Sequence, residues 1–204
     1  MSEPARQSES RSDAGEAGLH LRVVGCGNPH AGDDSVGLEV VRRLRARGEG
    51  ACELLEMPQA SVEMLDLLQG AGVVLFVDAV SSGAPPGTVH LVPLPSSAIE
   101  PRALSSLSSH GWGLAEMLGL AGALGRPTPQ LMLLGVEVGT VGPGEACTPA
   151  VEGAIQIVVE KFPQLRVVLT GAGQRDGHDS RRFPPGDTTF PIGSGDAPIA
   201  VGGQ

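Results

Sequence analysis

Residues 23–37 join an apolar strand to an amphipathic helix through a glycine-rich turn, and this unit constrains the fold more than any other part of the chain. The turn contains Gly25 and Gly27, at positions where a Cβ atom would obstruct the backbone. The following helix carries valine and leucine at the spacing of one buried face, with arginines on the opposite face. Such a unit predicts the start of an open α/β sheet.

The alternation of strands and helices continues along the chain. Strands are predicted over residues 19–24, 52–56, 72–77, 88–92 and 131–136, and helices over 34–47, 61–68, 111–125 and 149–162. The run at 72–77 is apolar throughout, as is typical of a strand buried on both faces of a parallel sheet. The run at 88–92 follows a Pro-Pro-Gly turn and is predicted as an edge or antiparallel strand. We therefore predict a three-layer α/β/α sandwich with a mostly parallel twisted sheet.

The two ends of the chain differ in composition from this alternating region. Residues 1–18 are rich in serine, glutamate, arginine and alanine without periodicity, which predicts a disordered leader. Residues 170–204 are rich in glycine, proline, aspartate and arginine, which predicts a flexible tail. The predicted domain therefore spans residues 19–169.

Charge and cysteine content exclude several classes of protein. The net charge of −9 argues against nucleic acid or an anionic membrane as a partner. The three cysteines are dispersed and include no Cys-x-x-Cys pair, so neither a disulfide framework nor a zinc ribbon is supported. With no apolar run of membrane-spanning length and no signal peptide, the sequence predicts a cytoplasmic protein, which we expect to be a monomer.

Two adjacent carboxylates, Asp33 and Asp34, follow the glycine turn at the carboxyl end of the first strand, where open α/β sheets build their sites. One interpretation is structural, with Asp33 as the helix N-cap and Asp34 as a first-turn charge that complements the helix dipole. A dinucleotide site is disfavoured, because a pyrophosphate needs the bare positive end of the helix and two carboxylates occupy it. Carboxylates at this position suit a cation better.

Two further polar residues follow or precede predicted elements at the same edge. Asp78 comes directly after the apolar run 73–77, and His110 precedes the helix predicted from residue 111. If the first and third strands are neighbours, Asp78 lies beside the loop that carries Asp34. Two carboxylates and an imidazole suit a divalent metal such as nickel or zinc, and three protein ligands leave open positions for water or substrate.

Other candidates carry less weight. A Ser109–His110–Asp78 triad is disfavoured, because adjacent residues rarely present both nucleophile and base to one point. Cys26 is interpreted as a small buried residue beside the glycine turn, and Glu137 is a weaker site candidate after a buried strand.

Four motifs occur in one order along the chain: Gly-x-Gly-Asn-x-x-x-x-Asp-Asp-x-x-Gly at 25–37, Val-Asp-Ala at 77–79, Ser-His-Gly at 109–111 and Leu-Gly-Val-Glu at 134–137. In these motifs the chain resembles the nickel–iron hydrogenase maturation endopeptidases, over about residues 20–160. The resemblance implies a cytoplasmic protease that removes a C-terminal extension from the hydrogenase large-subunit precursor after nickel is inserted. It also implies that Asp34, Asp78 and His110 are the metal-contacting and catalytic residues. The metal would be nickel, supplied by the substrate, or another divalent ion.

The same resemblance places Asp33 at a position linked to substrate recognition, and we assign Gly27 and Asn28 of the turn to substrate binding with it. The sequence leaves open whether the metal takes part in the chemistry or only in recognition. The alternative function is a non-cleaving metal-binding accessory or chaperone for hydrogenase assembly.

Overall fold

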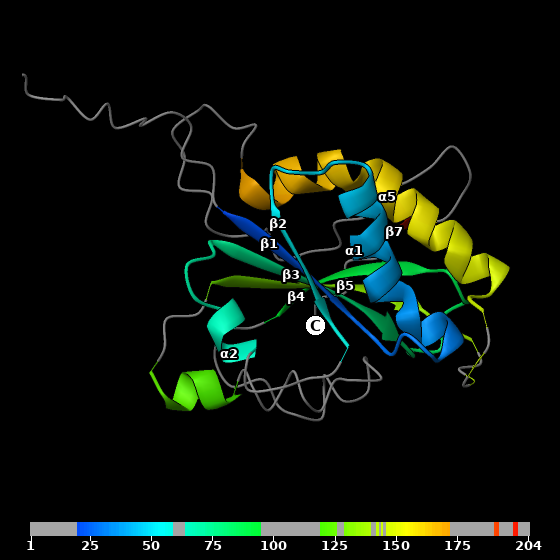
Figure 1. Cartoon of the computed structure of the whole chain (residues 1–204), viewed down its shortest axis with the longest axis horizontal. Helices are drawn as coiled ribbons and strands as arrows, with labels where there is room; N and C mark the ends of the chain where they lie inside the picture. Colours follow the sequence, from blue (N-terminus) through cyan, green and yellow to red (C-terminus); the bar gives the residue numbers. More distant parts are fainter. Residues whose placement is uncertain are drawn as a thin grey trace, which may run out of the picture.

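The computed structural model describes residues 20–58, 64–94, 119–125, 129–139, 142, 144, 146–171, 190–191 and 198–199. Its centre is a five-stranded twisted sheet in the order β2-β1-β3-β5-β4 (Figure 1). The strands are β1 (Leu21–Cys26), β2 (Glu53–Met57), β3 (Val73–Val80), β4 (Val89–Leu94) and β5 (Gln130–Glu137). The neighbours β2-β1, β1-β3 and β3-β5 are parallel, and only β4 is antiparallel to its partner. The predicted antiparallel edge strand is therefore confirmed.

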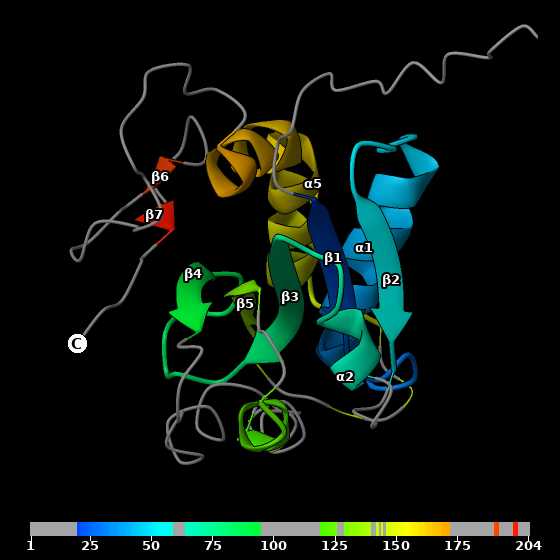
Figure 2. The same cartoon turned by 90° about the vertical axis from the view of Figure 1, so that its left-hand side faces the viewer.

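Helices cover both faces of this sheet (Figure 2). On one face, α1 (Val36–Ala46) and α5 (Pro149–Thr170) pack on a core that includes Leu21 and Val23 of β1. On the other face, α2 (Met64–Leu67) and a helical turn at 119–123 pack on a second core that includes Val24. Because successive side chains of a strand point to opposite faces, β1 contributes to both cores. The predicted three-layer α/β/α sandwich is confirmed.

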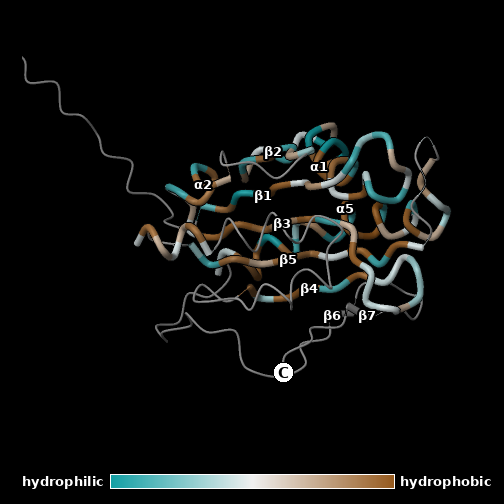
Figure 3. The backbone as a smooth tube through the Cα atoms, turned by 90° about the horizontal axis from the view of Figure 1, so that it is seen from below, coloured by the Kyte–Doolittle hydropathy of each residue, from teal (hydrophilic) through white to brown (hydrophobic). Residues whose placement is uncertain are grey.

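The central strands β3 and β5 are largely apolar, as the brown stretches of their tubes in Figure 3 show. All eight residues of β3 are buried. The sequence predicts that this strand ends at residue 77, but β3 continues to Val80 and pairs Asp78 with Gly135 of β5. The prediction of the strand end was wrong because Ala79 and Val80 resume the apolar run beyond the carboxylate. Asp78 therefore lies inside the ladder.

The helix predicted from residue 34 starts differently. Residues Gly32–Ser35 form a 3-10 turn, η1, and the α-helix begins only at Val36. The Ser35 hydroxyl donates to the Gly32 carbonyl oxygen at 2.7 Å, a local bond that stabilises the tighter turn. Neither η1 nor α1 has a side-chain N-cap, so the interpretation of Asp33 as the cap of this helix is wrong.

The last helix is longer than predicted. The sequence predicts a helix over residues 149–162, yet α5 continues through Pro163 to Thr170. Proline removes one helical hydrogen bond, but Leu165 and Leu169 are buried against the sheet and hold the final turns in place. Gly171 ends the helix in a left-handed conformation with φ 65°.

Several predicted segments lie outside the described residues, including the leader 1–18, most of the helix at 111–125 and most of the tail 170–204. Within that tail, β6 (Phe190–Pro191) and β7 (Pro198–Ile199) form a short antiparallel pair that the sequence did not predict. In the part of the chain that the structure describes, no helix combines the length and apolarity needed to cross a membrane.

Glu56 of β2 links the outer edge of the sheet to α1, and we predict an acid-sensitive contribution to stability. Arg45 Nη1 and Arg42 Nε donate to its carboxylate at 2.6 and 2.9 Å, and these bonds, that of Arg45 first, lower the pKa of Glu56 below its ordinary value of 4.5. Since the folded pKa is the lower one, this stability is complete above pH 4.5 and is lost as the pH falls through the folded value. At pH 6 the free energy of unfolding of Glu56→Gln, measured in urea, should be lower than that of the original chain by less than about 1 kcal/mol. That difference should shrink as the pH is lowered below 4.5, and an equal difference at pH 6 and at pH 3 would contradict the prediction.

Candidate active site

Asp34 and Asp78 come from neighbouring parts of the carboxyl edge of the sheet. Strands β1 and β3 are parallel neighbours with Gly25 opposite Val77, so Asp78 follows directly on the last paired position. The η1 turn that carries Asp34 packs against β3. Both carboxylates are buried, with 6% of Asp34 and 2% of Asp78 exposed, and Asp78 Oδ1 accepts from the Ala79 amide at 2.8 Å. The structure thus places two buried acids at one edge.

Close backbone contacts bring η1 and α1 onto the strand ends. A Cβ atom on Gly37 would lie 2.1 Å from the Val77 carbonyl oxygen and 2.3 Å from that of Cys26. A Cβ atom on Gly25 would lie 2.2 Å from the Gly37 carbonyl oxygen. The first turn of α1 therefore touches the backbone of both β1 and β3, which any larger residue would prevent.

The turn residues Gly27 and Asn28 hold the backbone of Asp34. Gly27 has φ 139°, and a Cβ atom there would lie 2.0 Å from the Asp34 carbonyl oxygen. The Asn28 amide donates to that same oxygen at 3.2 Å, while Asn28 Oδ1 accepts from the His30 amide at 3.0 Å. Asn28 is exposed, so this turn forms the solvent-facing border of the site.

Asp33 has a different environment from Asp34. It is 1% exposed, and its two carboxylate oxygens accept from the Thr148 amide at 2.6 Å and the Thr148 hydroxyl at 3.0 Å. Thr148 lies 115 residues away in the sequence, immediately before α5. The sequence analysis missed Thr148 as a partner of Asp33, because no local pattern connects two residues so far apart in the chain.

His110 lies outside the described residues, as does Ser109, so the structure tests neither the metal-binding trio nor the disfavoured triad. Within the described ranges, no three histidine, cysteine, aspartate or glutamate side chains gather to hold a metal ion. The two described members of the trio fit such an ion by their chemistry, because carboxylate oxygens are ligands of divalent metals.

Cys26 lies beside this pair and is not poised as a nucleophile. Burial, followed by the nearby charge of Asp78, raises the pKa of the Cys26 thiol well above its ordinary value. The thiol therefore stays protonated at neutral pH. This agrees with the interpretation of Cys26 as a small buried residue.

Glu137, the weaker candidate, anchors the loop after β3. The carboxylate is 1% exposed and accepts from the Ser82 amide, the Ser82 hydroxyl and the Gly83 amide, each at 2.8 Å. His90 Nε2 lies 3.4 Å from Glu137 Oε2. These contacts account for a buried glutamate at the end of β5 without a metal.

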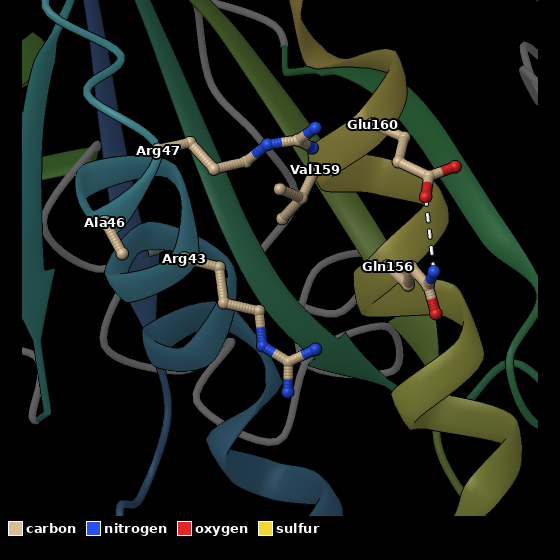
Figure 4. A pocket seen from close by; sticks show the side chains of 6 residues that line it. All are labelled: Arg43, Ala46, Arg47, Gln156, Val159 and Glu160. Carbon is tan, nitrogen blue, oxygen red and sulfur yellow. Dashed lines mark hydrogen bonds between the residues drawn. The ribbon is translucent and has the colours of Figure 1, made fainter.

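A cavity of about 370 Å³ lies elsewhere, between α1 and α5 (Figure 4). It is lined by Arg43, Ala46, Arg47, Gln156, Val159 and Glu160. Arg43 and Ala46 lie in the C-terminal half of α1, about 10 to 15 Å along its axis from Val36. The cavity is therefore separate from the carboxylate pair.

Comparison with known proteins gives one consistent result. The family model described as hydrogenase maturation protease matches residues 38–164. The chain belongs to the hydrogenase maturation protease family. It is 30% identical over 153 residues to the hydrogenase expression/formation protein HupD of Thiocapsa roseopersicina, covering 69% of this chain and 68% of that relative. It is 27% identical over 146 residues to the hydrogenase 2 maturation protease of Escherichia coli K12, covering 70% and 88%.

The fold of this protease agrees with that of a solved relative. The hydrogenase maturating endopeptidase HybD from E. coli superposes with a TM-score of 0.62 at 25% identity, covering 74% of this chain and 94% of HybD. The resemblance predicted from the four motifs is thus confirmed, and the protein is an endopeptidase of this family.

Proposed function

We propose that this protease removes a C-terminal extension from the nickel-loaded precursor of a nickel–iron hydrogenase large subunit. The observation that carries the proposal is the pair of buried carboxylates, Asp34 and Asp78, at the carboxyl edge of the sheet in a member of this family. In this proposal nickel arrives as part of the substrate. The protease acts in the cytoplasm as a monomer.

Asp34, Asp78 and His110 are the residues that we assign to contact with the metal. A bound divalent metal can polarise a carbonyl or lower the pKa of a water molecule. The two carboxylates orient the precursor's metal-bearing segment through their oxygen atoms, and Asp78 Oδ1 is already directed by the Ala79 amide. Both side chains are buried, so water screens an interaction between a carboxylate and a cation less here than it would at the surface.

Substrate binding is assigned to the turn beside the carboxylates. Gly27 and Asn28 border the site, and the Asn28 side chain faces solvent, where an extended peptide can approach it. Met57 pairs with Cys26 at the end of the neighbouring strand β2, but it is buried in the second core. The exposed turn at Asn28 is therefore the part of this border that a peptide can reach.

The decisive experiment compares cleavage with binding. Purified protease is incubated with nickel-loaded and with nickel-free precursor, and the intact mass of each product is measured. We expect a shortened subunit and a released C-terminal peptide only from the nickel-loaded sample. Stable association without a change in mass would instead identify a metal-binding accessory or chaperone.

A further inference from the structure

The segment that precedes α5 holds the turn that carries Asp34. The Gly144 amide donates to the His30 carbonyl oxygen at 2.7 Å, and the Cys147 thiol lies 3.4 Å from the Gly32 carbonyl oxygen. Thr148 makes two bonds to Asp33, as described above. Gly144, Cys147 and Thr148 thus contact three of the residues just before Asp34.

Thr148 connects the start of α5 to this turn through hydrogen bonds. Its Oγ1 atom accepts from the Val151 amide at 3.5 Å as the N-cap of α5 and donates to Asp33 Oδ2. The helix has 22 residues, and its buried side chains from Val151 to Leu169 belong to the core. Asp33 is therefore bonded to the end of a rigid element, and Asp34 is the next residue.

We propose that Asp33 is a positioning residue, which fixes the η1 turn so that Asp34 meets the metal-bearing substrate in the productive geometry. This inference rests on the proposed function. It replaces the direct substrate contact implied for Asp33, because both of its oxygens are already bonded to Thr148 in a position that is 1% exposed.

Two substitutions at Asp33 test whether this residue positions the turn through its hydrogen bonds or recognises the substrate through its charge. Asparagine retains an oxygen that accepts from the Thr148 amide, and its NH₂ group can donate to the Thr148 hydroxyl, so Asp33→Asn should keep nearly the original cleavage rate. Asp33→Ala removes both bonds. Because a displacement of about 1 Å can cost about 100-fold, we expect kcat to fall about 100-fold in Asp33→Ala with KM nearly unchanged.

Arg43→Ala supplies a matched control. Arg43 ties α1 to the same first turn of α5, through two bonds to Glu152 at 2.7 and 2.8 Å, and its loss leaves the two bonds between Asp33 and Thr148 in place. Exposed pairs of this kind contribute less than about 1 kcal/mol. This variant should therefore lose some stability and retain the rate of cleavage.

If Asp33→Ala fails to fold, Thr148→Val tests the same contact from the other side. Thr148→Ser restores the hydroxyl group and should restore the rate of cleavage.

A second measurement tests the inference without any cleavage. The Asn28 amide donates to the Asp34 carbonyl oxygen, and the Asp34 amide donates to that of Ala31, so their hydrogen exchange reports on the turn. Both amides should exchange faster in Asp33→Ala, and at the original rate in Asp33→Asn and Arg43→Ala. If the unaltered protease does not cleave, the proposed function fails while exchange still decides the role of Asp33. Unchanged exchange in Asp33→Ala, or Asp33→Asn as slow in cleavage as Asp33→Ala, would overturn the inference.

Discussion

Asp78→Asn is expected to lower the rate of precursor cleavage by about 100-fold or more while the chain remains folded. Partners that merely orient metal ligands already contribute about 10- to 100-fold, so loss of a ligand carboxylate should cost at least as much. Asparagine keeps the shape of the side chain and the oxygen that accepts from the Ala79 amide, so the local backbone of β3 is preserved. The initial rate is measured by intact mass on nickel-loaded precursor, with circular dichroism on the same samples.

Two further variants give this experiment its controls. Asp66→Asn makes the same chemical change on the exposed face of α2 and should leave the rate unchanged. Asp34→Glu keeps the carboxylate and should be milder than Asp34→Ala. Cleavage by Asp78→Asn at close to the original rate would remove Asp78 from the site.

Gly37→Ala is expected to destabilise the domain by about 3 kcal/mol or more, the upper part of the range for overpacked cores. The new methyl group would lie 2.1 Å from the Val77 carbonyl oxygen, and the opposing atoms belong to the backbone of buried strands, which cannot rotate away. Relief requires α1 to lift from the ends of β1 and β3, which also moves η1. Urea unfolding followed by circular dichroism measures the loss, and cleavage should fall with it.

Gly153→Ala is the matched control for that substitution. Gly153 lies inside α5, and a Cβ atom there would meet nothing within 4 Å. Alanine favours the helix over glycine by about 1 kcal/mol, so this variant should be as stable as the original chain or more so. Equal urea midpoints for the two variants would contradict the close contact at Gly37.

The candidate site was predictable only in part. The order of elements placed Asp34 and Asp78 at one edge, because parallel neighbouring strands end together, with Asp34 in the turn after β1 and Asp78 near the end of β3. The role of Asp33 was not predictable in this way. Its partner Thr148 is 115 residues distant, and no local pattern connects the two. His110 remains a prediction from the motif, outside the described residues.

The amino-acid sequence alone determined the alternating elements, the buried central strand and the three-layer architecture. These follow from periodicity and from runs of apolar residues, which act over a few neighbouring positions. Only the tertiary structure decided that Asp78 lies within β3, that α5 passes through Pro163, and that Asp33 is bonded to the start of that helix. Each of these depends on burial or bonding between segments far apart in the chain, and such contacts exist only once the layers have packed together.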